Sequence, residues 1–326
     1  SPCSPFAGPL LRKNETPRPD AQKIGKFDIL RVLGTGAQSV VYLAHDAHLQ
    51  REVAIKSLHL EGRDEARKQA LMDEARTVSK LRHPNIVPIF DAGEQDGDPY
   101  LVFEYVEGSS LAEYLRGKGG MPPPRAIEVM LLILDAVESA HRHGIIHRDL
   151  KPSNILMNSE DGTPGISEGI TGTPAYLAPE CINDGLASVQ SDIFSAGLIL
   201  CELLTGKPVV GGKDVLAILH RMATEPIRLP PEAAGVVDDR LGDIILKATA
   251  MDTAARYADI PALRAALKAW LTPEEDAAPR TAEGGKQSTL DFLLRRMRHK
   301  SDFPALSEAI STINRLAASD QESVSS

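Results

Sequence analysis

Cysteine is scarce in this sequence, and its scarcity excludes two classes of protein. The 326 residues include only three cysteines, Cys3, Cys181 and Cys201, which are odd in number and far apart. That spacing fits neither a disulfide framework nor a zinc knuckle, and unpaired thiols are typical of a reducing compartment. We therefore expect a protein of the cytoplasm.

Long hydrophobic runs and an excess of basic residues are also missing. The longest apolar run, Ile193 to Leu204, is interrupted by Ser195 and Glu202, so it predicts a buried helix and not a membrane span. The formal net charge of −9 argues against a nucleic-acid-binding surface over the whole chain, though not against a local basic patch. We expect neither nucleic acid nor a membrane as a partner.

The most informative stretch of the chain is the run from His147 to Asn154. Within it Asp149 can accept a proton, Lys151 can neutralise a phosphate, and Asn154 can bind a hard cation through its amide oxygen. A polar turn in which Asp and Asn cap backbone groups is the simpler alternative. Apolar pairs on both sides of the run favour a rigidly mounted loop instead.

This run, His-Arg-Asp-Leu-Lys-Pro-Ser-Asn, resembles the catalytic loop of protein kinases, and its Lys-Pro step is the serine/threonine form. The resemblance implies transfer of the γ-phosphoryl group of ATP to a Ser or Thr hydroxyl of a protein substrate, with Mg²⁺ as the metal. Asp149 would accept or orient the hydroxyl proton. Lys151 would offset charge on the moving phosphoryl group, and Asn154 would hold magnesium.

Two glycines, Gly34 and Gly36, separate two segments of strand-forming residues, Phe27–Leu33 and Val40–Ala44. Glycine lets the backbone approach phosphate oxygens because it has no Cβ. A dinucleotide-binding fingerprint would continue into a helix, whereas the second segment here is β-branched and aromatic. The arrangement resembles the kinase glycine-rich loop with Ser39 in place of the third glycine, although the glycines alone are equally consistent with an ordinary hairpin turn.

Lys56 ends the sequence Val-Ala-Ile-Lys, which matches the kinase strand that carries the ATP-positioning lysine. A lysine in an apolar strand needs a partner. The segment from Asp64 to Leu81 has apolar residues at helical spacing and predicts a helix packed on the sheet. Within it Glu74 matches the family's ion-pair glutamate, and the alternative is one more solvated helix charge.

Strands are also expected at Ile86–Phe90 and Tyr100–Tyr105, followed by Tyr105-Val106-Glu107-Gly108, which resembles the hinge between kinase lobes. The backbone of that hinge would bind the adenine edge. The resemblance implies a nucleotide site formed by Leu33, Gly34, Gly36, Val41, Ala54, Lys56, Glu74, Glu104 and Val106.

From Pro122 onward the apolar spacing predicts a helix that ends at His143-Gly144 and leads into the catalytic loop. Farther along, the resemblance assigns two structural roles. Asp192 would brace the catalytic loop through backbone N–H groups, and Arg256 would pair with Glu180.

One family motif is missing. Kinases place Asp-Phe-Gly after the catalytic loop, and its Asp holds magnesium. Here the interval from Asn154 to Ala178 is short, and Glu168-Gly169 is all that resembles the motif, so Glu168 is our candidate for a second magnesium ligand. Three explanations compete: an active kinase with an incomplete activation segment in this sequence, a natural variant that uses Glu168, or a pseudokinase that binds nucleotide without turnover.

We expect an α+β fold of the two-lobed kinase type, with a small antiparallel β lobe plus one helix and a larger, mainly helical lobe. The end of the chain, from Phe303, resembles the opening of an HDOD domain, and a simple tail helix is an equal alternative. The substrate, the activating signal and the oligomeric state are not readable from the sequence. The expected divisions are a disordered lead-in at 1–25, a kinase domain at 26–271 (lobes 26–105 and 109–271), a linker at 272–288 and a helical tail at 289–326.

Overall fold

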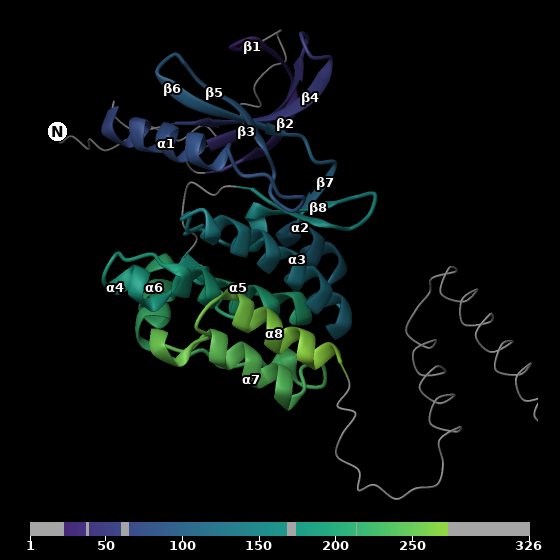
Figure 1. Ribbon diagram of the computed structural model, residues 1–326, viewed down its shortest axis with the longest axis vertical. Helices are drawn as coiled ribbons and strands as arrows, with labels where there is room; N and C mark the ends of the chain where they lie inside the picture. Colours follow the sequence, from purple (N-terminus) through teal and green to yellow (C-terminus); the bar gives the residue numbers. More distant parts are fainter. Residues whose placement is uncertain (1–22, 37–38, 60–64, 168–173, 213, 273–326) are drawn as a thin grey trace, which may run out of the picture. The chain divides into compact units, whose positions relative to one another are not determined.

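A computed structural model describes residues 23–36, 39–59, 65–167, 174–212 and 214–272 (Figure 1), all within the first of two compact units, Ser1–Pro273. These residues form a small β-rich lobe and a larger helical lobe. The α+β, two-lobed architecture predicted from the sequence is confirmed. The predicted linker and helical tail lie outside the described residues.

The small lobe is built on a six-stranded antiparallel sheet. The short strand β1 pairs with the start of β2, and both of its residues lie within the stretch 1–25 expected as a lead-in. The strand expected at Ile86–Phe90 begins only at Ile89, because Ile86 pairs with Ile166 of the large lobe instead. The strands, in spatial order, are β1 (Lys23–Ile24), β2 (Phe27–Thr35), β3 (Ser39–Asp46), β4 (Arg51–Leu58), β6 (Asp98–Glu104) and β5 (Ile89–Gln95).

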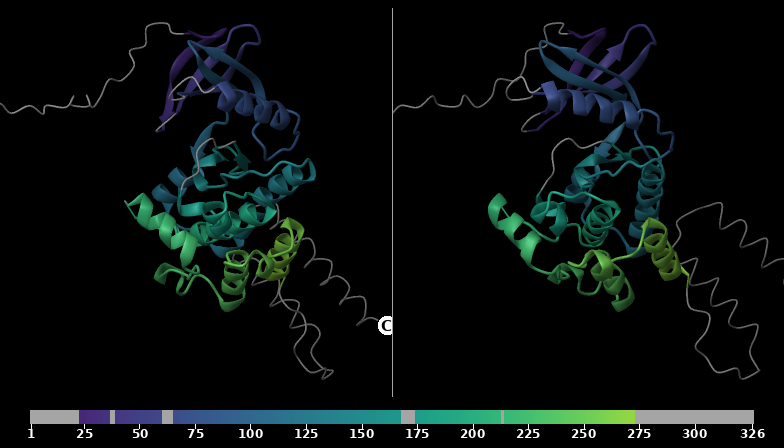
Figure 2. Two further views of the ribbon diagram at one scale, coloured as in Figure 1. Left: turned by 90° about the vertical axis from the view of Figure 1, so that its left-hand side faces the viewer. Right: turned by 60° about the vertical axis from the view of Figure 1, so that its left-hand side comes forward.

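Side-chain alternation gives this sheet two apolar faces. Val53 and Ile55 of β4 lie in a buried cluster on one face. Ala54 packs with Phe103 on the other, in a cluster that includes Ala75 of the helix α1 (Glu65–Val78). Successive residues of a strand point to opposite faces, so the single strand β4 contributes to both clusters. Figure 2 shows α1 lying along the sheet.

The large lobe is mainly helical, and its two longest described helices are α3 (Pro123–Arg142) and α5 (Val189–Thr205), which pack in one apolar core. Every residue of α5 from Ser191 to Leu204 is buried, which confirms the buried helix predicted there. Within the described ranges, no helix is both long enough and apolar enough to cross a bilayer. The other helices are α2 (Leu111–Lys118), α4 (Pro179–Asn183), α6 (Val215–Thr224), α7 (Asp239–Ala248) and α8 (Ile260–Leu271).

Helix α2 was not predicted, although its start has a recognisable signal. The Ser110 side chain accepts from the Glu113 N–H at 3.2 Å, and the Glu113 carboxylate accepts from the Ser110 N–H at 2.9 Å. The Ser110 N–H and the Ser110 hydroxyl, which both donate to the Glu113 carboxylate, lower the pKa of Glu113. Ser-x-x-Glu before an apolar residue is the capping-box pattern, which marks a helix N-terminus.

A second sheet of three short strands lies in the large lobe. It consists of β7 (Gly108–Ser110), β8 (Ile155–Asn158) and β9 (Pro164–Ile166), in that spatial order. Gly162 lies in the turn between β8 and β9 with a φ of 68°, a left-handed conformation that favours glycine.

Backbone hydrogen bonds tie this second sheet to the segment that follows α1. The Val87 N–H donates to the Ile166 carbonyl at 2.8 Å, and the Ile166 N–H donates to the Asn85 carbonyl at 2.8 Å. The Asn85 side chain also donates to the Pro164 carbonyl at 2.7 Å. Strand β9 is therefore bonded on one edge to β8 and on the other to the chain that enters the small lobe.

The loop after α3 is held by a single buried carboxylate. Asp192, in the first turn of α5, is 1% exposed and accepts the N–H groups of His147 at 2.9 Å and Arg148 at 3.1 Å. His141 Nε2 lies 2.7 Å from the same carboxylate. Arg148 has a φ of 65°, a left-handed conformation that non-glycine residues adopt only when their surroundings impose it. The predicted bracing role of Asp192 is confirmed.

Arg256 and Glu180 form a buried bidentate ion pair. Arg256 NH1 and NH2 lie 2.7 Å and 2.8 Å from the two Glu180 carboxylate oxygens, and the arginine side chain is 0% exposed. Arg256 also donates to the carbonyls of Gln190 and Ala250. The predicted pair is confirmed, and it joins α4 to the start of α5 and the turn before α8.

Replacing Arg256 with Met should lower the free energy of unfolding by about 3–5 kcal/mol, because it leaves the largely buried Glu180 charge without its partner. Urea unfolding at neutral pH measures this difference. Arg116→Met, at an exposed position of α2, is the matched control and should change the value by less than about 0.5 kcal/mol. Equal effects of the two substitutions would contradict the structural role given to Arg256.

Replacing Asp192 with Asn should cost about 1–3 kcal/mol, because each carboxylate oxygen accepts one N–H group and the amide NH₂ that replaces one of these oxygens cannot accept. Amide hydrogen exchange resolves the effect locally: His147 and Arg148 should exchange faster, whereas amides in the core of α3 should not. Asp184→Asn, at the exposed end of α4, serves as the control. Unchanged exchange at His147 and Arg148 would show that something other than Asp192 holds the loop.

Candidate active site

The polar side chains of the loop form one bonded group. Lys151 Nζ lies 2.8 Å from Asp149 Oδ2. The Asn154 side-chain NH₂ donates to the same oxygen at 3.0 Å and to the Asp149 carbonyl at 2.8 Å. All three residues are buried. The structure thus brings together Asp149, Lys151 and Asn154, as the sequence predicted.

The charges in this group offset one another. A buried carboxylate or ammonium alone would lose several kcal/mol of hydration, and a partner at ion-pair distance compensates much of that loss. The side chains of Lys151 and Asp149 are only 9% and 8% exposed, so their attraction is weakly screened. Lys151 and Asn154 both contact Asp149 Oδ2, and neither of these contacts uses Oδ1. The group therefore presents one carboxylate oxygen for a further contact.

A second buried polar pair fixes the segment that returns toward this loop. The Tyr176 hydroxyl donates to the Glu202 carboxylate, and Ser195 Oγ donates to the Tyr176 carbonyl at 2.8 Å. Burial raises the pKa of Glu202, and the hydrogen bond from Tyr176 partly opposes that shift. Burial and the nearby carboxylate raise the pKa of Tyr176. Tyr176 therefore stays a neutral donor and holds the turn Pro174–Tyr176 on α5.

The small lobe supplies the predicted lysine. Lys56 lies on β4, opposite Val41 of β3 and Leu101 of β6. Two residues earlier, Ala54 lies opposite Phe103 and packs in the cluster that contains α1. Because residues two apart share one face of a strand, Lys56 is directed to the same side of the sheet as Ala54. That side carries the contacts with the large lobe.

The glycine segment is a strand-to-strand connection. Gly34 of β2 lies opposite Val41 of β3, and the Gly36 N–H donates to the Ser39 carbonyl at 2.7 Å. The residues after the glycines are strand, so the dinucleotide-binding alternative is excluded. A Cβ placed on Gly34 would meet no atom of the described residues within 4 Å, so packing against them does not require glycine there. Leu33, at the end of the same strand, is exposed.

The segment that resembles a hinge lies between β6 and β7. Val106 is half-buried and packs against the cluster on the α1 side of the sheet, together with Leu156 of β8. The Glu104 N–H donates to the Pro88 carbonyl at 3.0 Å, and the Glu104 side chain is exposed. The adenine contacts expected at Glu104 and Val106 remain predictions.

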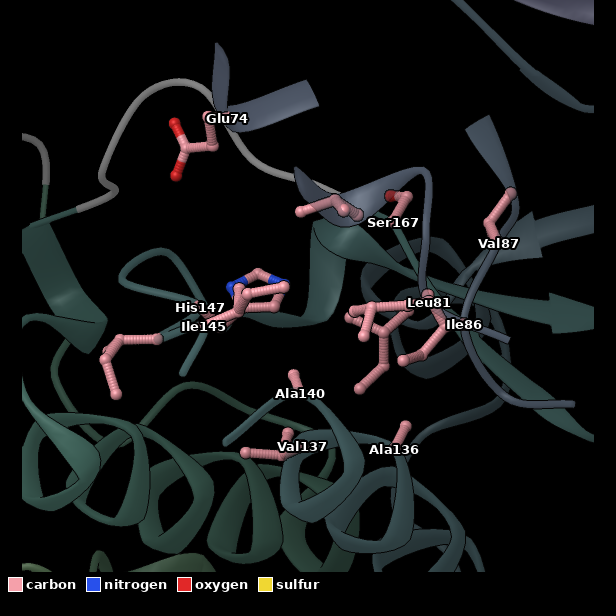
Figure 3. Close-up of a pocket in the computed structure, with 13 residues that line it drawn as sticks. Glu74, Leu81, Ile86, Val87, Ala136, Val137, Ala140, Ile145, His147 and Ser167 are labelled. Carbon is pink, nitrogen blue, oxygen red and sulfur yellow. The ribbon is translucent and has the colours of Figure 1, made fainter. Parts of the chain in front are cut away.

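A small cavity of about 40 Å³ lies where α1, α3 and the loop approach one another (Figure 3). Its lining is mostly apolar, and the polar groups at it are Glu74, His147 and Ser167. His147 Nε2 is buried and has no hydrogen-bond partner among the described residues. Glu74 is exposed on α1 and lines this cavity. Its ion pair with Lys56 remains a prediction.

Ser167 is the residue that our sequence analysis missed. It follows β9 directly, and its N–H and Oγ donate to the Asn154 carbonyl at 2.9 Å and 3.1 Å. Ser167, the residue that directly follows the strand, therefore lies beside Asn154. The signal was present in the sequence: counting back two positions from Gly169, as Asp-Phe-Gly requires, gives Ser167 and not Glu168. Glu168 itself lies outside the described residues.

The side chains around Asn154 provide only some of the ligands that a magnesium site needs. Magnesium in nucleotide enzymes is usually held by one or two carboxylates together with phosphate oxygens. Asn154 offers an amide oxygen, Asp149 is ion-paired with Lys151, and Ser167 offers a hydroxyl. In the part of the chain that the structure describes, no three His, Cys, Asp or Glu side chains are grouped to hold a metal. These residues do not form the two-ligand site that kinases use.

Proteins named as serine/threonine-protein kinases are similar to this chain in sequence. Serine/threonine-protein kinase PrkC of Bacillus subtilis (strain 168) is 39% identical over 264 residues, which are 75% of this chain and 40% of that protein. Serine/threonine-protein kinase PknB of Mycobacterium leprae (strain TN) is 32% identical over 287 residues, 81% of this chain and 46% of that protein. The chain thus spans less than half the length of these relatives.

A family model described as the protein kinase domain matches residues 27–269. These residues contain both lobes, the bonded group around Asp149 and the Lys56 strand. Members of this family use ATP and a divalent metal, typically Mg²⁺. This chain belongs to the protein kinase domain family.

Proposed function

We propose that this chain is an ATP-dependent serine/threonine protein kinase domain that phosphorylates Ser or Thr hydroxyls of protein substrates in signalling. The observation that carries the proposal is the buried group in which Lys151 and Asn154 both bond Asp149 Oδ2. Its relatives PrkC and PknB are named serine/threonine-protein kinases, which supports the same reading. Because ATP is the phosphoryl donor, we also propose that the domain works in the cytoplasm.

In the proposed reaction each residue acts by position and charge. Asp149 orients the acceptor hydroxyl through a carboxylate oxygen and accepts its proton. Lys151 is held within 2.8 Å of Asp149, where its positive charge can also offset charge on the transferred phosphoryl group. Lys56 binds the α- and β-phosphates and Glu74 orients it, while the backbone at Gly34 and Gly36 lies against the phosphates.

The adenine and ribose are proposed to bind between Leu33, Val41, Ala54, Glu104 and Val106. Support comes from the register, which sets Ala54 and Lys56 on the same side of β4. For the metal, Asn154 is the proposed ligand in the catalytic loop. A second ligand at Glu168 also remains a proposal. A divalent metal, when bound, neutralises charge on the phosphates.

A second candidate function is a pseudokinase that binds nucleotide and acts as a signalling scaffold. Ser167 is the specific observation in its favour, because it places a hydroxyl beside Asn154 where a metal-holding carboxylate would be needed. The two candidates share the nucleotide site and differ in turnover, so they can be separated by experiment.

Replacing Asp149 with Asn should reduce phosphoryl transfer about 10²–10⁴-fold, because the amide cannot accept the hydroxyl proton. The measurement is transfer of radiolabelled phosphate from ATP to a generic protein substrate, with ATP affinity measured in parallel. Ser153→Ala, at an exposed position of the same loop, is the control and should leave the rate within about twofold of wild type.

The outcomes distinguish the candidates. Transfer that is lost with Asp149→Asn while ATP still binds supports the kinase. ATP binding without transfer in the unmodified chain supports the scaffold. An unmodified chain that binds no ATP under any condition would refute both.

A further inference from the structure

The pairing of β8 with β9 determines which residue lies opposite Asn154 and could act as a second metal ligand. Ile155 of β8 lies opposite Ile166 of β9, so the next step outward places Asn154 opposite Ser167. The two hydrogen bonds from Ser167 to the Asn154 carbonyl agree with that register. β9 is also bonded to Asn85 and Val87 on its other edge, so it cannot shift along β8 without breaking both sets of bonds.

Several polar atoms near Asn154 already take part in hydrogen bonds or ion pairs. The Asn154 NH₂ is bonded to Asp149, which leaves its amide oxygen, Oδ1, as the side-chain atom for a cation. Asp149 Oδ2 is bonded to Lys151, and a cation at that oxygen would face the lysine charge at short range. A divalent ion next to Asn154 therefore gains a neutral amide oxygen and a hydroxyl from the described side chains, and no unpaired carboxylate.

We propose that Ser167 occupies the metal-ligand position of this nucleotide site, and that the chain consequently binds ATP with little dependence on Mg²⁺. This inference rests on the proposed nucleotide-binding function and specifies its metal requirement. A hydroxyl is a weaker ligand for a hard cation than a carboxylate, since it brings no negative charge. ATP is then held mainly by protein cations and backbone groups, and a carboxylate at position 167 would make binding metal-dependent.

The substitution Ser167→Asp tests the proposal by adding that carboxylate. In Mg²⁺ the variant gains a charged ligand opposite Asn154, whereas in EDTA its negative charge lies near the phosphates and weakens binding. The same Asp at Thr253, an exposed residue of the turn before α8, is the matched control because it adds an equal charge outside the nucleotide site. Ser167→Ala removes the hydroxyl bond to the Asn154 carbonyl without adding a ligand.

The measurement is the Kd for ATP by titration calorimetry in excess Mg²⁺ and in EDTA, with Mn²⁺ binding to the nucleotide complex followed by electron paramagnetic resonance. For the unmodified chain and both controls we expect the two Kd values to agree within about threefold. For Ser167→Asp we expect ATP to bind at least about tenfold more tightly in Mg²⁺ than in EDTA, with Mn²⁺ retained in the complex. Thermal unfolding of each variant confirms that it is folded.

Three results would overturn the proposal. An unmodified chain whose ATP affinity falls about tenfold or more in EDTA already holds the metal through another residue, and the proposed function would still stand. A folded Ser167→Asp variant with no gain in Mg²⁺ dependence would show that position 167 does not face the ion. ATP binding in none of the variants, with or without metal, would refute the nucleotide site itself together with this inference.

Discussion

The buried carboxylate of Asp192 is the constraint on which the active-site geometry depends. A carboxylate that is 1% exposed loses its hydration, and it is stable only because two backbone N–H groups and His141 replace the lost water contacts. Those two N–H groups belong to His147 and Arg148, which directly precede Asp149. The left-handed φ of Arg148 then turns the chain so that the next residues face inward. One buried charge thereby sets the direction of the catalytic loop.

The second constraint is the pairing of β9 on both edges. β8 leads out of the loop that ends at Asn154, and β9 returns beside it, so Asn154 and Ser167 come together without any side-chain interaction being needed. The opposite edge of β9 bonds the segment that leads from α1 into β5. The segment that leads into β5 of the small lobe is therefore held beside β9 by backbone hydrogen bonds, which do not depend on the identity of most side chains.

Sequence alone predicted those features in which a motif and a physical requirement coincide. Asp192, Arg256 and Glu180 are charges that must be paired when buried, and the structure pairs them. Helix α2 was missed because it is short, although its capping box was readable. Ser167 was missed for a different reason: its position two residues before Gly169 was readable, but we assigned the role to its acidic neighbour Glu168. Only the strand register shows that Ser167 lies opposite Asn154. Register is a tertiary property, because a shift of one residue exchanges the two faces of a strand.

The fold and the metal site are separable in this chain. The bonds that hold the catalytic loop are internal: Asp192 to two N–H groups, Lys151 and Asn154 to Asp149. None of these bonds involves a side chain at position 167, and the hydrogen bonds of Ser167 go to the backbone carbonyl of Asn154. A carboxylate at that position would lie next to Asn154 and its backbone carbonyl, where it would be costly without a cation. Because position 167 is a serine, the loop needs no cation in order to fold. The folded loop by itself therefore does not demonstrate metal-dependent catalysis.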